Sequence, residues 1–217
     1  MDNLNSYLEH TLLKIDTSIT DVRRICEEAV QYTMGGVCIP PLFVREAKRI
    51  LGEESKTKVV TVIAFPMGYS ALAAKTEEIK RALDEGADEI DGVINMAALK
   101  SGNWNHVEND IEGMALATNL KGKQFKLIIE IGLLTEEDLK RVVAFALNSR
   151  VKYLKTSTGM HGFPVTTDQV KLLRKIADPA LKIKASGGVK TKQQAIDLIK
   201  AGADRIGTSA AMEILKG

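Results

Sequence analysis

The sequence predicts a (β/α)8 barrel of eight parallel strands in a single domain, residues 1–217, and two observations carry this prediction. Short apolar runs alternate with amphipathic stretches from end to end, and eight such runs can be counted. The runs are rich in Val and Ile with little strict alternation, which is typical of parallel strands buried on both faces. An open doubly wound sheet, the competing architecture, usually carries a G-x-G-x-x-G motif after its first strand, and that motif is absent here.

An internal repeat of sequence supports the count of eight. The run GADEI at residues 86–90 returns as GADRI at residues 202–206, which is 116 residues later. Four β–α steps separate the two runs, so each step averages about 29 residues, enough for one strand, one helix and two short loops. Eight such units imply a closed barrel.

The expected elements follow in chain order. A short extra helix is expected over residues 2–7, where it closes the bottom of the barrel. The helices between strands carry capping boxes at their starts and glycines at their ends, the boxes at Ser18, Thr135, Thr166 and Thr191 and the glycines at Gly52, Gly86 and Gly202. The strands are expected over residues 9–13, 36–39, 58–65, 87–95, 125–131, 151–156, 181–186 and 203–208.

Composition excludes several classes of protein. The net charge is only +2 and no block of five or six like charges occurs, so neither a nucleic-acid nor a membrane partner is expected. No apolar stretch approaches the ~20 residues of a membrane span, and the start has no secretory signal. Cys26 and Cys38, with the three histidines, show no disulfide framework and no zinc-ligand spacing. A cytoplasmic location without metal or cofactor is therefore expected.

Three charged side chains are expected at the carboxyl ends of the strands, where barrels place their active sites. Asp91 alternates with Ile90 and Ile94, so it faces the lumen if the isoleucines pack on helices. The same alternation brings Lys155, at the end of the sixth run, and Lys184, in the seventh, toward the lumen. Each alone could be a snorkelling lysine or a satisfied polar group, but the three together favour chemistry.

Two neighbouring lysines suggest how an amine nucleophile is made. A lysine with its ordinary pKa near 10.4 is neutral in roughly one molecule in 2,500 at pH 7. A second ammonium group and partial desolvation both disfavour the charged form. Lys184 is therefore expected to free the Lys155 amine for a Schiff base, with Asp91 carrying protons.

Two glycine-containing loops predict a phosphate site. Ser186-Gly187-Gly188-Val189 follows the seventh run, and Gly207-Thr208-Ser209 follows the eighth. Glycines there expose backbone N–H groups at the usual phosphate position of a barrel. The alternative is that they only make tight turns. Cys38, which ends the second run, is more readily explained as a small buried hydrophobe than as a nucleophile.

Taken together, these motifs resemble the deoxyribose-phosphate aldolase family over nearly the whole chain. The resemblance rests on residues 10–14 (HTLLK), 65–68 (FPMG), 89–95 (EIDGVIN), 155–159 (KTSTG), 184–189 (KASGGV) and 207–209 (GTS). It implies a class I, metal-independent aldolase without a cofactor. Such an enzyme reversibly cleaves 2-deoxy-D-ribose 5-phosphate to D-glyceraldehyde 3-phosphate and acetaldehyde in deoxyribonucleoside catabolism.

The resemblance also implies residue roles and a homodimer. Lys155 matches the Schiff-base lysine, Lys184 the second lysine that perturbs it, and Asp91 the aspartate of the proton relay. Contacts to substrate or its phosphate are implied for Thr158, Gly159, Gly187, Gly188, Gly207 and Ser209. Possible relay or pocket positions are Glu9, Thr11 and Cys38.

Several positions depart from the family pattern and leave the preference for acceptor and donor open. They are Glu9 for Asp, Ile15 for Pro, Pro40 for Asn, Ile131-Gly132 for a more polar pair, and Met160 for Lys or an aromatic residue. Two other functions stay open from the residues alone. One is a phosphosugar isomerase or epimerase that uses Asp91 as a base without a covalent step, and the other is a non-catalytic phosphosugar-binding protein.

Overall fold

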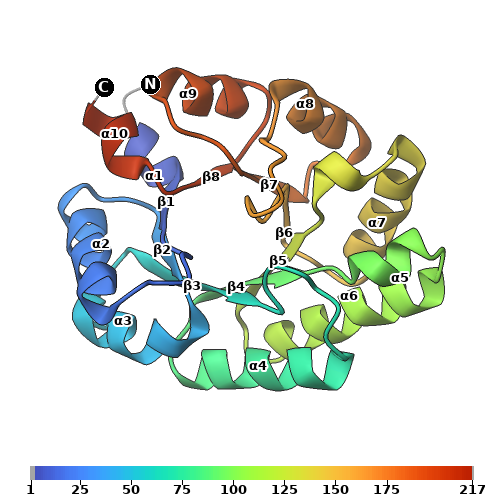
Figure 1. Ribbon diagram of the computed structural model, residues 1–217, viewed down its shortest axis with the longest axis horizontal. Helices are drawn as coiled ribbons and strands as arrows, with labels where there is room; N and C mark the ends of the chain where they lie inside the picture. Colours follow the sequence, from blue (N-terminus) through green and yellow to red (C-terminus); the bar gives the residue numbers. More distant parts are fainter. Residues whose placement is uncertain (1–2, 217) are drawn as a thin grey trace.

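The structure, a computed structural model, describes residues 3–216 and confirms the predicted fold class. Eight parallel strands close into a barrel in sequence order, with the helices around its outside (Figure 1). The closure pairs β1 with β8 through Glu9 and Gly207. The strands are β1 (Leu8–Thr11), β2 (Gly36–Ile39), β3 (Lys58–Ile63), β4 (Glu89–Val93), β5 (Gln124–Ile128), β6 (Tyr153–Lys155), β7 (Lys182–Ser186) and β8 (Arg205–Thr208).

Most strands are shorter than the apolar runs that predicted them, and hydrogen bonding explains why. The backbone N–H groups of Ala87, Val151 and Ala203 donate to carbonyls five residues earlier, at 3.0, 2.9 and 3.0 Å. These bonds complete the ends of the preceding helices. The first two residues of each run therefore belong to a helix end, and β4, β6 and β8 begin two residues later than predicted.

The helices begin where the sequence signals placed them. All four capping boxes form, at Ser18, Thr135, Thr166 and Thr191. The extra helix is observed from Leu4, whereas its expected start at Asp2 lies outside the described residues. The helices are α1 (Leu4–Tyr7), α2 (Ile19–Gln31), η1 (Pro41–Phe43), α3 (Val44–Leu51), α4 (Leu72–Asp84), α5 (Met96–Lys100), α6 (Trp104–Asn119), η2 (Ile131–Leu133), α7 (Glu136–Asn148), α8 (Thr167–Ile176), α9 (Lys192–Lys200) and α10 (Ala211–Lys216).

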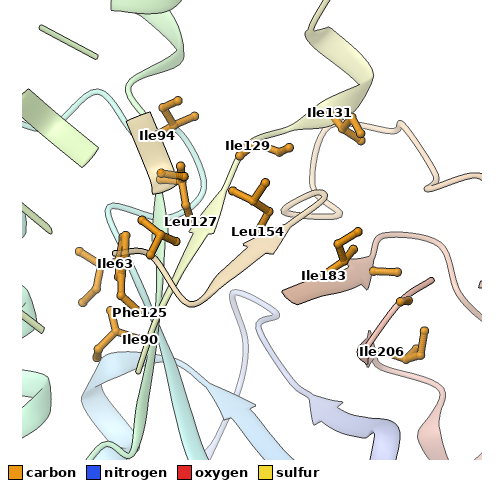
Figure 2. Packing of buried hydrophobic residues seen from close by; sticks show 14 of the residues in the cluster. Ile63, Ile90, Ile94, Phe125, Leu127, Ile129, Ile131, Leu154, Ile183 and Ile206 are labelled. Carbon is orange, nitrogen blue, oxygen red and sulfur yellow. The ribbon is translucent and has the colours of Figure 1, made fainter. Parts of the chain in front are cut away.

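The main apolar core lies between the barrel and the helices, and it decides which side chains face the lumen. Figure 2 shows its strand side, where Ile90, Phe125, Leu154, Ile183 and Ile206 are all fully buried. Because side chains alternate along a strand, the neighbours of these residues point inward. Many inward positions carry charge instead of the bulky apolar residues common in barrel interiors. The lumen is thus a polar site rather than a simple core.

Between residues 3 and 216, none of the helices combines the length and apolar character that crossing a membrane requires.

Candidate active site

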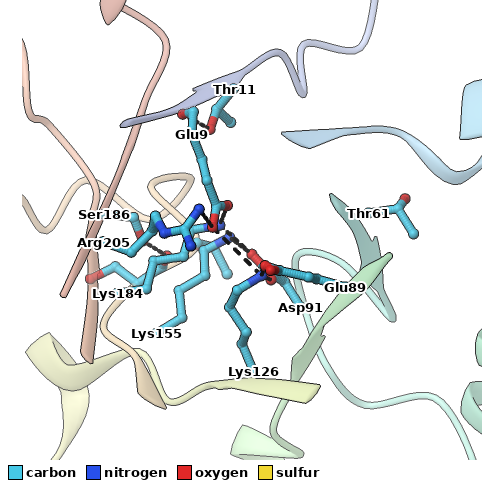
Figure 3. A network of polar contacts seen from close by, with 12 residues as sticks. Glu9, Thr11, Thr61, Glu89, Asp91, Lys126, Lys155, Lys184, Ser186 and Arg205 are labelled. Atoms are coloured by element: carbon cyan, nitrogen blue, oxygen red, sulfur yellow. Dashed lines mark hydrogen bonds and ion pairs between the residues drawn. The ribbon is translucent and has the colours of Figure 1, made fainter. Parts of the chain in front are cut away.

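Asp91 on β4 holds the two predicted lysines at one oxygen atom. Its Oδ2 accepts hydrogen bonds from Lys155 Nζ at 3.0 Å and from Lys184 Nζ at 2.6 Å (Figure 3). The side chains of Asp91 and Lys184 are completely buried, and Lys155 is 2% exposed. Strands β4, β6 and β7 therefore bring together the three residues that alternation assigned to the lumen.

A third lysine, which the sequence analysis missed, completes the network from below. Lys126 on β5 places its Nζ 2.5 Å from Glu89, 2.9 Å from Asp91 and 3.6 Å from Glu9. Glu9 on β1 also accepts from Lys184, so its longer side chain reaches the second lysine. Arg205, at the start of β8, lies 3.9 Å from Glu9. A series of alternating charges thus connects Arg205, through Glu9, Lys184 and Asp91, to Lys155 (Figure 3).

The same alternation that identified Asp91 also contains the signal for Lys126. Phe125, Leu127 and Ile129 are buried in the outer core, so Lys126 and Ile128 must face the other way. Lys126 interrupts the fifth apolar run in the same way as Asp91 interrupts the fourth. The ion pair of Lys126 with Glu89 depends on the register of β4 and β5, which places Asp91 opposite Lys126. The spacing of residues in the sequence does not reveal this register.

The charge inside the lumen does not balance if every group is ionised. Three carboxylates face four cationic side chains, namely Glu9, Glu89 and Asp91 against Lys126, Lys155, Lys184 and Arg205. An unpaired buried charge is costly. Of the four cationic side chains, Lys155 is the one that lines the open cavity.

Electrostatics fixes the charge state of the groups behind Lys155. Burial alone would raise the pKa of Asp91, but Lys126, Lys184 and Lys155 outweigh it and hold that pKa well below its usual range. Burial likewise opposes the charged forms of Lys126 and Lys184, yet the neighbouring carboxylates raise the pKa of both above the ordinary lysine value. Asp91 is therefore a carboxylate and Lys184 an ammonium group at neutral pH.

These pKa shifts predict how the free energy of unfolding depends on pH. A carboxyl with a lowered folded-state pKa stabilises the fold above its unfolded pKa, about 3.9 for Asp, and that stabilisation is lost as pH falls through the folded value. We expect the free energy of unfolding to fall with pH below about 4, and to fall less steeply in Asp91→Asn. Urea unfolding at several pH values between 3 and 7 measures both slopes, and equal slopes would contradict the assignment to Asp91.

A cavity of about 470 Å3 opens above Lys155 at the carboxyl ends of the strands. Besides Lys155, the predicted residues that line it are Thr11, Thr158, Gly159, Gly187, Gly188, Gly207 and Ser209. Asp91, Lys184, Glu9 and Cys38 do not line it. They lie buried behind the cavity wall, so Cys38 has the buried environment expected for a small hydrophobe, and burial raises the pKa of its thiol.

The glycines of the two loops are required by their surroundings. Gly187 and Gly188 have φ of 100° and 74°, and a Cβ on Gly188 would lie 2.8 Å from Pro164 Cβ. A Cβ on Gly207 would lie 3.0 Å from Lys184 Cε, so this glycine makes room for the second lysine. Tight turns and close packing therefore both need these glycines, and all three also line the cavity.

Glu130 positions the loop that follows Lys155. Its Oε2 accepts from the Thr158 hydroxyl at 2.6 Å and from the Thr158 backbone N–H at 3.1 Å. The Glu130 backbone itself is left-handed, with φ 47° and ψ 60°, a conformation that costs a non-glycine residue roughly 1–2 kcal/mol. Such strain persists where surrounding contacts enforce it, often beside a functional site. Glu130 is the second residue that the sequence analysis gave no role.

Glu9, Cys38 and Asp91 form a cluster whose ligand atoms lie within 4.8 Å of one another. The carboxylates of this cluster already accept from Lys184, and Asp91 also accepts from Lys155 and Lys126. A divalent cation would have to displace these ammonium groups. We therefore expect EDTA to leave activity unchanged, and restoration of a chelator-inhibited enzyme by added Zn2+ or Mn2+ would contradict this.

In this closed barrel a lysine lines the cavity, and a carboxylate and a second lysine lie buried behind it. This arrangement defines the class of enzymes that use a lysine amine as a nucleophile. Comparison with known proteins narrows this class. A family model described as DeoC/LacD family aldolase matches residues 8–216, and the chain therefore belongs to that family of aldolases.

Full-length relatives support the assignment. The deoxyribose-phosphate aldolase of Geobacillus sp. (strain WCH70) is 43% identical over 217 residues, covering 100% of this chain and 96% of that protein. The deoxyribose-phosphate aldolase of Thermococcus gammatolerans is 40% identical over 216 residues, with 99% and 96% covered. The tetrameric deoxyribose phosphate aldolase from Aeropyrum pernix superposes with a TM-score of 0.91 at 29% identity, covering 98% of this chain and 89% of that chain.

Proposed function

We propose that the protein is a class I aldolase that cleaves 2-deoxy-D-ribose 5-phosphate to D-glyceraldehyde 3-phosphate and acetaldehyde through a Schiff base on Lys155. The observation that carries the proposal is the shared Asp91 Oδ2, which accepts from both Lys155 and Lys184 within 3.0 Å. Lys155 borders the cavity, whereas its two partners lie behind it. The substrate class is that of the relatives, which are deoxyribose-phosphate aldolases.

The proposed cleavage proceeds through an iminium ion and an enamine on Lys155. The Lys155 amine adds to the C1 aldehyde of the open-chain sugar, and loss of water gives an iminium ion. The C2–C3 bond then breaks: its electrons move into the iminium to form an enamine, while the C3 hydroxyl loses its proton and becomes the aldehyde of glyceraldehyde 3-phosphate. Protonation of the enamine at C2 and hydrolysis release acetaldehyde and restore Lys155.

Asp91 and Lys184 are suited to support these steps without touching the sugar carbons. Since Lys184 is held as an ammonium group, it sets a positive charge beside the Lys155 nitrogen and opposes a second one there. Asp91 orients both nitrogens and offers a path for protons between Lys155 and the groups behind it. Glu9 fixes Lys184 from the far side. The proposed relay thus joins Lys155, Asp91, Lys184 and water.

The phosphate group is proposed to lie against the loops after β7 and β8. Gly187, Gly188, Gly207 and Ser209 border this side of the cavity, together with the exposed Lys190. Backbone N–H groups of such loops bind phosphate oxygens. Thr158 and Gly159 face the same cavity from the loop after β6, where a hydroxyl can contact the sugar.

Position 160, where Met160 lines the cavity, could carry an additional cationic side chain. Its side chain lines the cavity and is 48% exposed. Met160→Lys is expected to lower KM for the phosphorylated substrate by about fivefold, the value of roughly 1 kcal/mol for an exposed ion pair. The gain should shrink at high salt. Steady-state kinetics with and without 0.5 M NaCl measure it, and the same drop in KM for unphosphorylated 2-deoxyribose would show that phosphate is not the cause.

Borohydride trapping tests the proposed function. Reduction of the enzyme in the presence of acetaldehyde or substrate is expected to fix an ethyl or sugar adduct on Lys155, located by peptide mass spectrometry. An isomerase or epimerase that used Asp91 as a base, and likewise a binding protein, would give no adduct. Turnover without any trapped adduct would therefore overturn the Schiff-base mechanism.

A further inference from the structure

A second cavity opens at the same end of the barrel, over the carboxyl ends of β1, β2 and β3. Its volume is about 320 Å3, near the lower end of the range for small-molecule sites. It shares Leu13 and Lys14 with the larger cavity above Lys155. We call this cavity the side chamber and define it by Leu13, Pro40, Pro41, Leu42, Val62 and Phe65.

The side chamber begins beside the reacting amine. The ring centroid of Phe65 lies 5.9 Å from Lys155 Nζ, and Val62 stands opposite Asp91 in the β3–β4 register. Val62 also packs with Cys38, Val60, Leu13 and Phe65 in an apolar cluster of its own. A carbon chain attached to Lys155 therefore has apolar surface on this side and the glycine loops on the other.

Two of the polar side chains in the chamber wall are already engaged, and a third, Lys14, is exposed to solvent. Thr17 Oγ1 donates to the Lys14 carbonyl at 2.7 Å, and Glu78 Oε2 accepts from the Ala64 backbone N–H at 2.9 Å. The rim is apolar and open to solvent, since Leu42 is 76% exposed and Ile15 is fully exposed. Such a wall binds a ligand by burying its apolar surface rather than by polar recognition.

We propose that the side chamber binds the apolar substituent of the donor, so that the enzyme uses enolisable aldehydes larger than acetaldehyde. This inference rests on the proposed Schiff-base function. In the synthetic direction the donor condenses with Lys155 and loses water and then a proton to give the enamine. Its C2 forms the new C–C bond to the carbonyl carbon of glyceraldehyde 3-phosphate, whose oxygen takes up a proton. Hydrolysis of the iminium then releases the product.

Pro40 is one of the apolar residues that line this chamber. A donor methylene buried against apolar surface gains about fourfold in kcat/KM. At position 40 the family pattern has asparagine, and an amide there would have to be desolvated by a passing alkyl chain. The sequence departure noted at Pro40 therefore falls where it would widen the range of donors.

Condensation of glyceraldehyde 3-phosphate with acetaldehyde, propanal, butanal and pentanal tests the proposal. The wild-type enzyme is expected to use the longer donors, with kcat/KM for butanal no lower than for acetaldehyde. Pro40→Asn and Leu42→Asp are each expected to lower the pentanal-to-acetaldehyde ratio of kcat/KM by about fifteenfold, the value of roughly two lost methylenes. Leu120→Asp is the matched control, because Leu120 is 77% exposed on the end of α6, and its ratio should stay that of the wild type.

The possible outcomes separate this inference from the function on which it rests. Turnover and trapping of acetaldehyde without use of longer donors would overturn the side chamber and leave the aldolase intact. Absence of any acetaldehyde adduct would overturn both. If Leu42→Asp instead changes the oligomeric state in analytical ultracentrifugation and leaves the donor ratio unchanged, a second copy of the chain covers the chamber and the proposal is wrong.

Discussion

Lys155→Met is expected to lower kcat/KM for cleavage by about 10^5-fold or more while leaving the stability of the barrel within about 1 kcal/mol of the wild type. The loss follows because Lys155 is the lining lysine that Asp91 holds at 3.0 Å, whereas Lys14 and Lys190, which also line the cavity, are exposed. Stability is retained because Asp91 keeps Lys184 at 2.6 Å and Lys126 at 2.9 Å. The variant also leaves three carboxylates facing three cations.

The control for this variant lies three residues earlier in the chain. Lys152 is exposed just before β6, and Lys152→Met removes the same charge without touching the lumen. We expect it to retain wild-type kinetics. Cleavage assays and urea unfolding on both variants separate chemistry from folding. Substantial activity in a folded Lys155→Met enzyme would mean that another group forms the covalent intermediate.

The number of apolar runs was enough to predict the fold, and alternation within single runs was enough to predict which charged residues face the lumen. Asp91 and Lys184 interrupt apolar patterns whose other members are buried in the outer core, and that signal is local. The contacts among them are not local, because Asp91 and Lys184 are 93 residues apart and meet only when the barrel closes. The sequence could therefore name the residues that share the lumen but not the single oxygen atom that joins them.

Two other features lay beyond sequence reasoning for related reasons. Glu130 acts through a left-handed backbone that turns its carboxylate toward Thr158, and no residue type announces such a turn. The side chamber depends on loops after three different strands. Sequence departures such as Pro40 acquire meaning only when those loops are placed beside Phe65 and Lys155.

Lys126→Met is expected to destabilise the protein by about 3–5 kcal/mol, the usual cost of removing one member of a buried ion pair. Lys126 is completely buried and contacts all three lumen carboxylates, at 2.5, 2.9 and 3.6 Å. Methionine fills similar space but compensates none of that charge. Lys123→Met is the matched control on the same approach to β5, because Lys123 makes only a partly exposed pair with Asp88 at 3.5 Å. Its expected cost is within about 1 kcal/mol.

Two further measurements show whether uncompensated charge, rather than lost packing, causes the Lys126→Met effect. Adding Glu89→Gln removes the carboxylate nearest Lys126, so the double variant should be more stable than Lys126→Met alone, with a coupling energy of about 0.5–3 kcal/mol. In Lys126→Met, a lumen carboxyl group has lost its neighbouring cation, so its pKa is expected to be higher in the folded protein than in the unfolded chain. Stability of the variant should then rise relative to the wild type as pH falls from 7 to 5. A packing defect would give neither the coupling energy nor this pH dependence of stability, because a loss of apolar contacts does not involve a group that binds a proton.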